Sequence, residues 1–366
     1  MRIKPAVWLL SLFWPLVLPL EIYLAEYSGS GIWYWLVPLE MYVLLPVLDE
    51  LIGDGKFTAG PDEIRELENE RYYRVITMLT VPLHILAMIL CCYYISITEL
   101  SWYDLLGLVL SLGLNNALAI NTAHELGHKN TALEKWLAKI LLALPAYGHF
   151  YVEHNRGHHR HVATAEDHSS ARMGEGLYRF ALRSIPGEVL RACQLEYARL
   201  SRKGLSVWGL HNDCVQSWVI SLLYYFALLY AFGMNLMPFL FIQALFAWFE
   251  ITTANYIEHY GLLRQKDEQG HYLPCRPEHS WNSNRLLSGL VLFNLQLHSD
   301  HHANAGRRYQ ALVSHQEAPT LPGGYPVMFI CALFPPLWRQ VMDKRLLAYY
   351  AGDPSRINRI VTPATS

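Results

Sequence analysis

Six apolar runs divide the chain into regions that favour lipid and regions that favour water. The runs cover about residues 7–27, 32–51, 75–97, 102–123, 219–232 and 238–256. A helix needs roughly 20 mainly apolar residues to cross a bilayer. Short turns at 28–31, 98–101 and 233–236 join the runs in pairs. The pattern predicts an all-α integral membrane protein with six transmembrane helices.

The stretches between the paired runs are polar and are predicted to lie outside the membrane. They cover residues 52–74, 124–216 and 257–361. The last five residues, 362–366, have the Thr/Pro/Ser composition of a linker. No internal repeat is evident in the sequence. We therefore expect residues 1–366 to form one membrane-embedded domain, with 362–366 as a linker-like tail.

Composition agrees with a membrane protein and indicates its orientation. The chain is 52% hydrophobic and only 16% charged, whereas soluble domains are about 25% charged. A net charge of −2 gives no reason to expect nucleic acid binding. None of the 29 Lys and Arg residues falls in the three short turns. The positive-inside rule therefore predicts that both termini and the long polar regions face the cytoplasm.

Histidines provide the strongest chemical signal in the sequence. Nine of them lie in four short stretches of the predicted cytoplasmic side: His124, His128, His154, His158, His159, His259, His298, His301 and His302. Imidazole is a ligand for iron, copper and zinc, and a spacing of three or four residues on a helix directs two rings to one spot. Nine such residues are too many for one ion. The count predicts two metal ions with four or five imidazoles each.

Two other interpretations of the histidines are weaker. The segment His124-Glu125-x-x-His128 fits the signature of a zinc protease, which would make the protein an intramembrane metalloprotease. A mononuclear zinc enzyme uses about three protein ligands, so this reading leaves both His-His pairs unexplained. A metal transporter would place ligands along a path through the membrane. Here only His84 lies inside a predicted span away from the others.

Four carboxylates stand next to the clustered histidines, at Glu125, Glu153, Glu258 and Asp300. A ligating ring usually donates its second N–H to an acid or a carbonyl, so these side chains are expected to orient the rings, or to bind the metals directly. The Glu258-His259 pair repeats the order of Glu153-His154. This repetition is one reason for including the isolated His259 in the set.

The position of the histidines suggests the kind of substrate. A metal site at the ends of apolar helices is accessible to a lipid-soluble hydrocarbon that enters from the bilayer. Oxidation of a carbon–hydrogen bond requires a redox-active metal, and zinc has no redox chemistry. Iron with dioxygen and two electrons meets that requirement.

Four motifs resemble those of the membrane-bound alkane 1-monooxygenases, a group within the integral-membrane di-iron desaturases and hydroxylases. They are Asn121-Thr-Ala-His-Glu-Leu-Gly-His-Lys129, Glu153-His-Asn-Arg-Gly-His-His159, Asn255-Tyr-Ile-Glu-His-Tyr-Gly-Leu262 and Leu295-Gln-Leu-His-Ser-Asp-His-His-Ala303. The resemblance extends over nearly the whole chain. The motif around His259 favours alkane hydroxylases over fatty-acyl desaturases, which remain the nearest alternative together with other hydroxylases of the superfamily.

This resemblance implies a function and a set of partners. It implies hydroxylation of the terminal methyl of medium- or long-chain n-alkanes to primary alcohols, with dioxygen as co-substrate and electrons from rubredoxin and its reductase. The nine histidines would hold two iron ions in a single catalytic domain. The expected location is the bacterial inner (cytoplasmic) membrane.

The resemblance also suggests residues of a substrate pocket. Met41 stands where some relatives have a bulky aromatic residue that limits chain length. Asn121 and Ala117 precede His124 by about one and two helical turns. We therefore expect Met41, Ala117 and Asn121 to contact the hydrocarbon.

Overall fold

The computed structural model describes residues 5–360. Within this part of the chain the regular secondary structure is helical, and the loops between the helices contain only isolated β-bridges. The predicted all-α class is confirmed. The predicted tail at 362–366 lies outside the described residues. The helices are η1 Pro5–Leu12, α1 Trp14–Ser28, η2 Gly31–Trp35, α2 Leu36–Leu39, η3 Glu40–Leu44, α3 Leu45–Ile52, α4 Pro61–Asn69, α5 Arg71–Ile97, α6 Trp102–Gly127, α7 Ala132–Ala143, α8 Phe150–Glu153, η4 His154–His158, α9 His159–His161, α10 Leu177–Ser201, α11 Asp213–Phe232, η5 Met234–Leu236, α12 Met237–His259, η6 Pro277–His279, α13 Leu286–Val291, α14 His298–Ala303, η7 Tyr309–Ala311, α15 Tyr325–Leu333, α16 Pro335–Tyr349 and η8 Pro354–Arg356.

The described residues contain five helical segments that are long and apolar enough to cross a membrane. A bent pair, η1 with α1, makes a possible sixth. These segments coincide with the six predicted spans, although the helices extend past the apolar runs into polar sequence. The helix α11 starts at Asp213 rather than near 219, because the Asn212 side chain caps it by accepting hydrogen bonds from the next turn.

The first span is bent, and the second is continuous but irregular. The axes of η1 and α1 meet at 48°, close to Pro15. The second span changes from a 3-10 turn to α-helix, to the π-helix η3, and back to α-helix, with Pro38 and Pro46 along the way. Proline lacks the N–H that would continue the helical bonding. Hydropathy predicts two spans here, and the prolines account for their irregular geometry.

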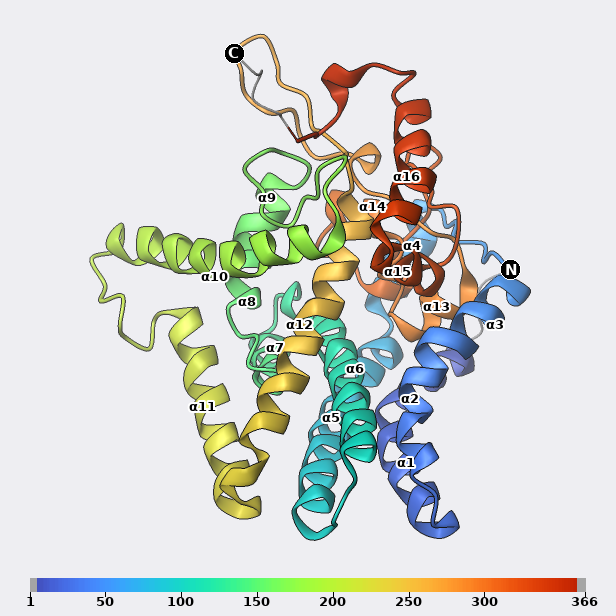
Figure 1. The fold of residues 1–366 in the computed structure, drawn as a ribbon. Coiled ribbons are helices and arrows are strands. Elements are labelled where there is room, and N and C mark those ends of the chain that lie inside the picture. Colours follow the sequence, from blue (N-terminus) through green and yellow to red (C-terminus); the bar gives the residue numbers. More distant parts are fainter. Residues whose placement is uncertain (1–4, 361–366) are drawn as a thin grey trace, which may run out of the picture.

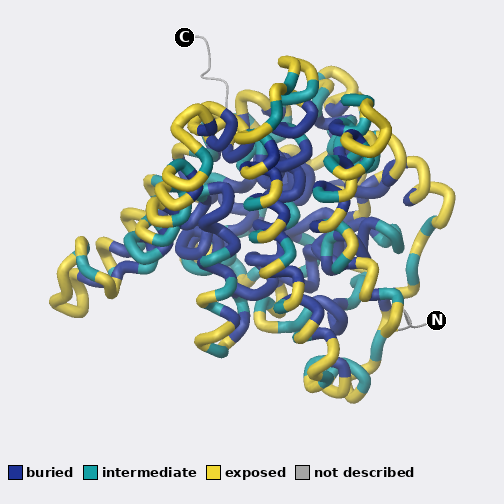
Figure 2. The backbone as a smooth tube through the Cα atoms, turned by 90° about the horizontal axis from the view of Figure 1, so that it is seen from below, coloured by how far each residue is buried: buried dark blue, intermediate teal, exposed yellow. Residues whose placement is uncertain are grey.

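The long helices run side by side and hold the buried core of the protein (Figure 1). α6 packs against α12, α5 and α7, and nearly every residue of α6 from Gly107 onward is buried. Figure 2 shows buried backbone at the centre, surrounded by segments with exposed residues. α10 crosses the upper ends of α11 and α12, while α15 packs against α12 and α3, and α16 packs against α15. The histidine-bearing ends of α6 and α12 are therefore enclosed by protein.

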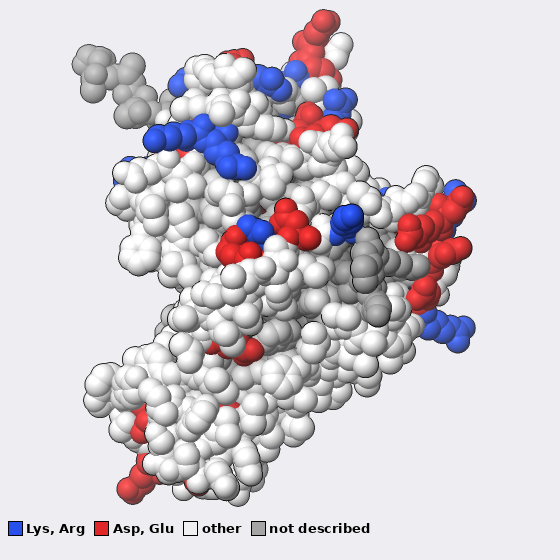
Figure 3. Space-filling view, turned by 90° about the vertical axis from the view of Figure 1, so that its right-hand side faces the viewer, with Lys and Arg blue, Asp and Glu red and all other residues white. Residues whose placement is uncertain are grey.

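Basic side chains gather at the end of the molecule that holds the histidines. On the face in Figure 3, no Lys or Arg is visible over the lower end, where the charged side chains in view are acidic.

A cluster of ion pairs connects several helices at the upper end of the bundle. Lys139 Nζ lies 2.7 Å from Asp213 Oδ1, and Arg156 pairs with both Asp213 and Glu196. These contacts connect α7, η4, α10 and α11 directly beside the histidines.

Candidate metal centre

The structure brings the nine predicted histidines together in two groups. One group contains His124, His128, His154, His159 and His301, and the other contains His158, His259, His298 and His302. Within each group, the potential ligand atoms all lie within 4.8 Å of one another. The groups are neighbours, since the ring centroids of His159 and His302 are 4.3 Å apart. Of the other eight histidines, none belongs to either group.

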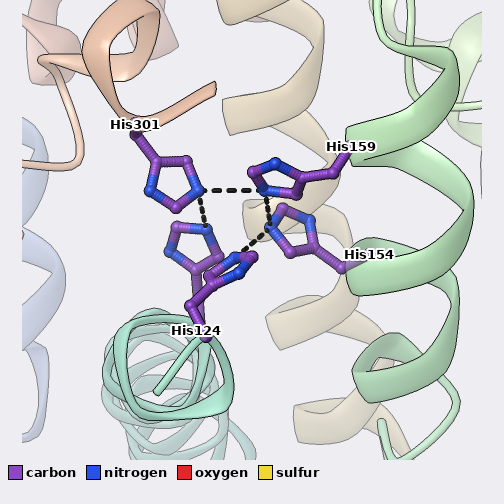
Figure 4. A group of neighbouring side chains, drawn as sticks. His124, His154, His159 and His301 are labelled. Carbon is purple, nitrogen blue, oxygen red and sulfur yellow. Dashed lines mark hydrogen bonds between the residues drawn. The ribbon is translucent and has the colours of Figure 1, made fainter. Parts of the chain in front are cut away.

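Each of the nine rings directs its Nε2 atom toward the other members of its group. In the five-histidine group, the Nε2 atoms of His124 and His301 are 2.9 Å apart, and those of His154 and His159 are 3.0 Å apart (Figure 4). In the second group, the Nε2 atoms of His298 and His302 are 2.9 Å apart. The lone pairs of several Nε2 atoms therefore point toward one another, an arrangement that is suited to binding a cation between them.

Six of the rings outside the membrane spans are held in the form that binds metal. Burial is the first cause that lowers the pKa well below its usual range for six of them: His128, His154, His159, His298, His301 and His302. A buried imidazole is driven to its neutral form because the charged form is poorly solvated. Neutral imidazole keeps the lone pair that a metal requires. The donor set therefore fits one metal ion in each group.

Helical spacing explains how most of the rings meet. His124 and His128 lie on one face of α6 at a spacing of four residues, and His298 and His302 do the same on α14. The segment His154–His158 is instead a π-helix, which bonds at a spacing of five residues. His154 and His159 consequently join the same group, and His158 is directed to the other one.

One carboxylate that the sequence reasoning missed orients a ring. Asp167 Oδ2 lies 3.0 Å from His158 Nδ1 and also accepts a hydrogen bond from Ser170. Burial acts to raise the pKa of Asp167, but the electrostatic interaction with His158 and these hydrogen bonds hold it well below its usual range. Asp167 is nine residues from His158 in sequence, and the histidine beside it, His168, belongs to neither group, so adjacency to a clustered histidine does not identify this acid. The backbone carbonyl of His279 orients His259 in a similar way, because its oxygen lies 3.4 Å from His259 Nδ1.

The four predicted carboxylates take different positions. Glu258 is the one beside a ring nitrogen, with Oε2 3.2 Å from His298 Nε2, while Tyr325 donates a hydrogen bond to its Oε1. Glu258 thus offers an oxygen to the four-histidine group. Glu153 is buried near Glu188 and Asp167, and burial raises its pKa, followed by the charges of these two acids.

The other two carboxylates bind groups that are not ligand rings. Glu125 pairs with Lys129 and accepts a hydrogen bond from the backbone N–H of Tyr309. Asp300 binds Arg307, His315 and the N–H of Val313. Both acids thus hold the loop that follows α14 in place. The expectation that Glu125 and Asp300 orient ligand rings is corrected, because the contacts described for them involve no ligand ring.

An apolar pocket lies next to the five-histidine group. Its walls include the three predicted residues, Met41, Ala117 and Asn121, and it encloses about 650 Å³ with its open mouth included. A smaller cavity of about 220 Å³ adjoins it and is lined by His124 and His301. The two spaces share Asn121, Leu292 and Leu295 as walls. Asn121 is held at this junction by a 2.9 Å hydrogen bond to the carbonyl of Leu292.

Comparisons with known proteins agree with this geometry. Residues 100–331 match the model of the fatty acid desaturase family. The chain is 49% identical to an alkane 1-monooxygenase of Pseudomonas putida, over 97% of this chain and 88% of that protein. It is 47% identical to alkane 1-monooxygenase 1 of Alcanivorax borkumensis, over the same shares. It is also 26% identical, over 92% of this chain and 82% of the relative, to the hydroxylase component of a xylene/toluene monooxygenase of Pseudomonas putida. The chain therefore belongs to the alkane 1-monooxygenase family, within the wider fatty acid desaturase family.

Proposed function

We propose that this protein hydroxylates the terminal methyl group of medium- or long-chain n-alkanes. One dioxygen, two electrons and two protons convert the alkane to a primary alcohol and water. The observation that supports this proposal best is the apolar pocket whose wall residues Asn121, Leu292 and Leu295 also line the small cavity beside His124 and His301. The relatives named as alkane 1-monooxygenases support the same reaction.

The metal in this proposal is iron, with one ion in each histidine group. Imidazole donors suit iron, copper or zinc, and the oxidation of a methyl group requires a metal that changes its redox state. A bound pair of iron ions would supply the redox chemistry that activates dioxygen. We propose rubredoxin, reduced by its reductase, as the electron donor. The basic end of the molecule would face the cytoplasm of a bacterial inner membrane, where such donors are found.

The protein's own residues would select the methyl group by position. Secondary carbon–hydrogen bonds are weaker than those of a methyl group, so selectivity for the chain end requires that the rest of the chain be held away. The junction at Asn121, Leu292 and Leu295 is suited to this role because it separates the large pocket from the small cavity beside the histidines. The apolar walls also exclude water from the reacting end.

The test is to supply the purified protein in lipid with iron, reduced rubredoxin and dodecane. We expect 1-dodecanol and close to two irons per chain. Dehydrogenation of a fatty acyl chain without alkane hydroxylation would favour a desaturase, and peptide cleavage with zinc bound would favour a protease. Either outcome contradicts the proposal.

Replacing Met41 by Trp is expected to shorten the preferred alkane. Met41 lines the apolar pocket, and the larger indole ring would fill space that a long chain needs. Turnover of hexadecane should fall relative to octane by at least about tenfold, the low end of what one methylene group is worth in an apolar pocket. The measurement is the ratio of 1-hexadecanol to 1-octanol formed from equal mixtures.

The matched control for this experiment is Val43→Trp. Val43 belongs to the same π-helix, is 53% exposed, and lines a different hollow on the outside of the bundle. We expect its chain-length profile to stay that of the unmodified protein. An unchanged profile in Met41→Trp would remove Met41 from the substrate pocket.

A further inference from the structure

A buried carboxyl group lies in the wall of the otherwise apolar pocket. Glu250, on α12, lines the pocket together with Tyr42 and is only 6% exposed. The Tyr42 hydroxyl donates a 2.5 Å hydrogen bond to Glu250 Oε1. No hydrogen bond within residues 5–360 involves the second oxygen, Oε2. An ionisable side chain at membrane depth is costly and usually has a function, and a hydrocarbon has no group that could bind this one.

The carboxyl group lies far from the histidines. Glu250 precedes His259 by nine residues on the same helix, which corresponds to about 13 Å at a rise of 1.5 Å per residue. Met41 and Tyr42, which lie in the π-helix η3, form the wall opposite α12. π-helical turns are frequent at functional sites because they redirect side chains. A polar group thus stands at the opposite end of the pocket from the proposed reaction.

We propose that Glu250 and Tyr42 form a binding site for a hydroxyl group at one end of a substrate whose other end is a methyl group. The protein would then hydroxylate 1-alkanols at the ω-carbon and produce α,ω-diols. An alcohol O–H donates a hydrogen bond to Glu250 Oε2, and the alcohol oxygen accepts one from a polar neighbour or a water. The chain extends through the pocket, and the methyl end reaches the cavity beside His124. This inference depends on the proposed alkane hydroxylation.

The reaction uses the same reagents as the proposed reaction of alkanes. At the ω-carbon, one carbon–hydrogen bond breaks and one carbon–oxygen bond forms, so this carbon loses two electrons. Dioxygen accepts those two electrons and two more from a reduced one-electron carrier such as rubredoxin. One oxygen atom enters the diol, and the other leaves as water after taking up two protons. The hydroxyl group held by Glu250 does not change.

A site built to bind a hydroxyl group discriminates by chain length. The distance between Glu250 and the histidines is fixed by α12, so only alcohols of matching extended length engage both ends. An n-alkane makes no such contact and tolerates a wider range of lengths. We therefore expect a narrower length optimum for 1-alkanols than for alkanes in the same preparation.

The experiment compares dodecane with a series of 1-alkanols from 1-octanol to 1-hexadecanol, with diols measured by mass spectrometry. The unmodified protein should form diol from at least one alcohol. In Glu250→Leu and Tyr42→Phe, the ratio of diol formation to dodecane hydroxylation should fall about tenfold or more, because each change removes one polar partner. The matched control is Glu40→Leu, which removes a carboxyl group from the same π-helix as Tyr42, at an outer hollow rather than in the apolar pocket. Its ratio should stay that of the unmodified protein.

A binding measurement separates this inference from the proposed function. Labelled 1-dodecanol is bound to the protein without an electron donor, and we expect Glu250→Leu to weaken its binding more than that of labelled dodecane. Dodecane turnover without diol formation, or diol formation that Glu250→Leu leaves unchanged, would overturn the inference and leave alkane hydroxylation standing. If dodecane is not oxidised, the proposed function fails, and the binding comparison alone decides whether the hydroxyl site exists.

Discussion

Replacing His159 by alanine is expected to abolish alkane hydroxylation and to remove iron from the protein. His159 Nε2 lies 3.0 Å from the Nε2 atoms of both His154 and His301, at the centre of the five-histidine group. Loss of a residue that only orients a ligand already costs roughly 10–100-fold in metal affinity or activity, so loss of a ligand should cost at least about a hundredfold. The measurements are iron per chain by mass spectrometry and 1-dodecanol formed from dodecane.

His161→Ala is the matched control for that variant. His161 lies two residues further on, belongs to neither group, and has its Nδ1 3.1 Å from Glu166 Oε2. We expect it to retain both iron ions and nearly full activity. Full iron content and activity in His159→Ala would contradict the assignment of the five-histidine group as a metal site.

Replacing Asp167 by asparagine should weaken metal binding by roughly 10–100-fold, the usual cost of losing a partner that orients a ligand. Asp167 accepts the Nδ1–H of His158, which leaves Nε2 of that ring as the lone pair directed to the four-histidine group. An amide in its place can present its NH₂ group to Nδ1 and thereby stabilise the wrong tautomer. The measurement is the rate at which a chelator removes iron, compared with the unmodified protein.

Glu166→Gln serves as the control for Asp167→Asn. It makes the same chemical change one residue earlier, where the carboxylate is more than half exposed and pairs with His161. Iron should leave this variant at the rate of the unmodified protein. Equal rates in both variants would mean that Asp167 has no part in holding the metal.

Most of the fold could be predicted from hydropathy, because lipid requires long apolar helices. The positions of the six spans follow from composition alone, and the structure has helices at all of them. The bend beside Pro15 and the π-helix between Pro38 and Pro46 were not predicted, because the apolar run continues through each of them. The helices of the polar regions were harder to predict from the sequence. A helix such as α10 packs against α8 and α12, and its sequence carries no regular spacing of apolar residues that would reveal it.

The histidines of the candidate site could be predicted from the sequence, but their division between two groups could not. The spacing of the histidines identified eight members of the two groups, and the repeated Glu-His order at the end of an apolar run added the isolated His259. Their division between groups depends on the π-helix at His154–His158, which pairs residues at a spacing of five. Nothing in the local sequence distinguishes that turn from an α-helical one, for which His154 and His158 would have shared a group.

Two polar side chains escaped prediction because their partners are distant in sequence. Asp167 reaches His158 through a loop, and Glu250 meets Tyr42 across the bundle, 208 residues away in sequence. An acid inside an apolar run, as Glu250 is, was the available signal. Interpreting it required knowing which helix faces α12.

Two short segments distribute their histidines over both groups, and this arrangement implies cooperative loading of the ions. The segment from His154 to His159 and the helix α14 each supply ligands to one group and to the other. The first ion to bind would immobilise both backbones and so pre-order the donors for the second ion, which then loses less conformational entropy. Iron titrations should consequently be sigmoidal, and half-filled molecules should be rare at every stage of assembly.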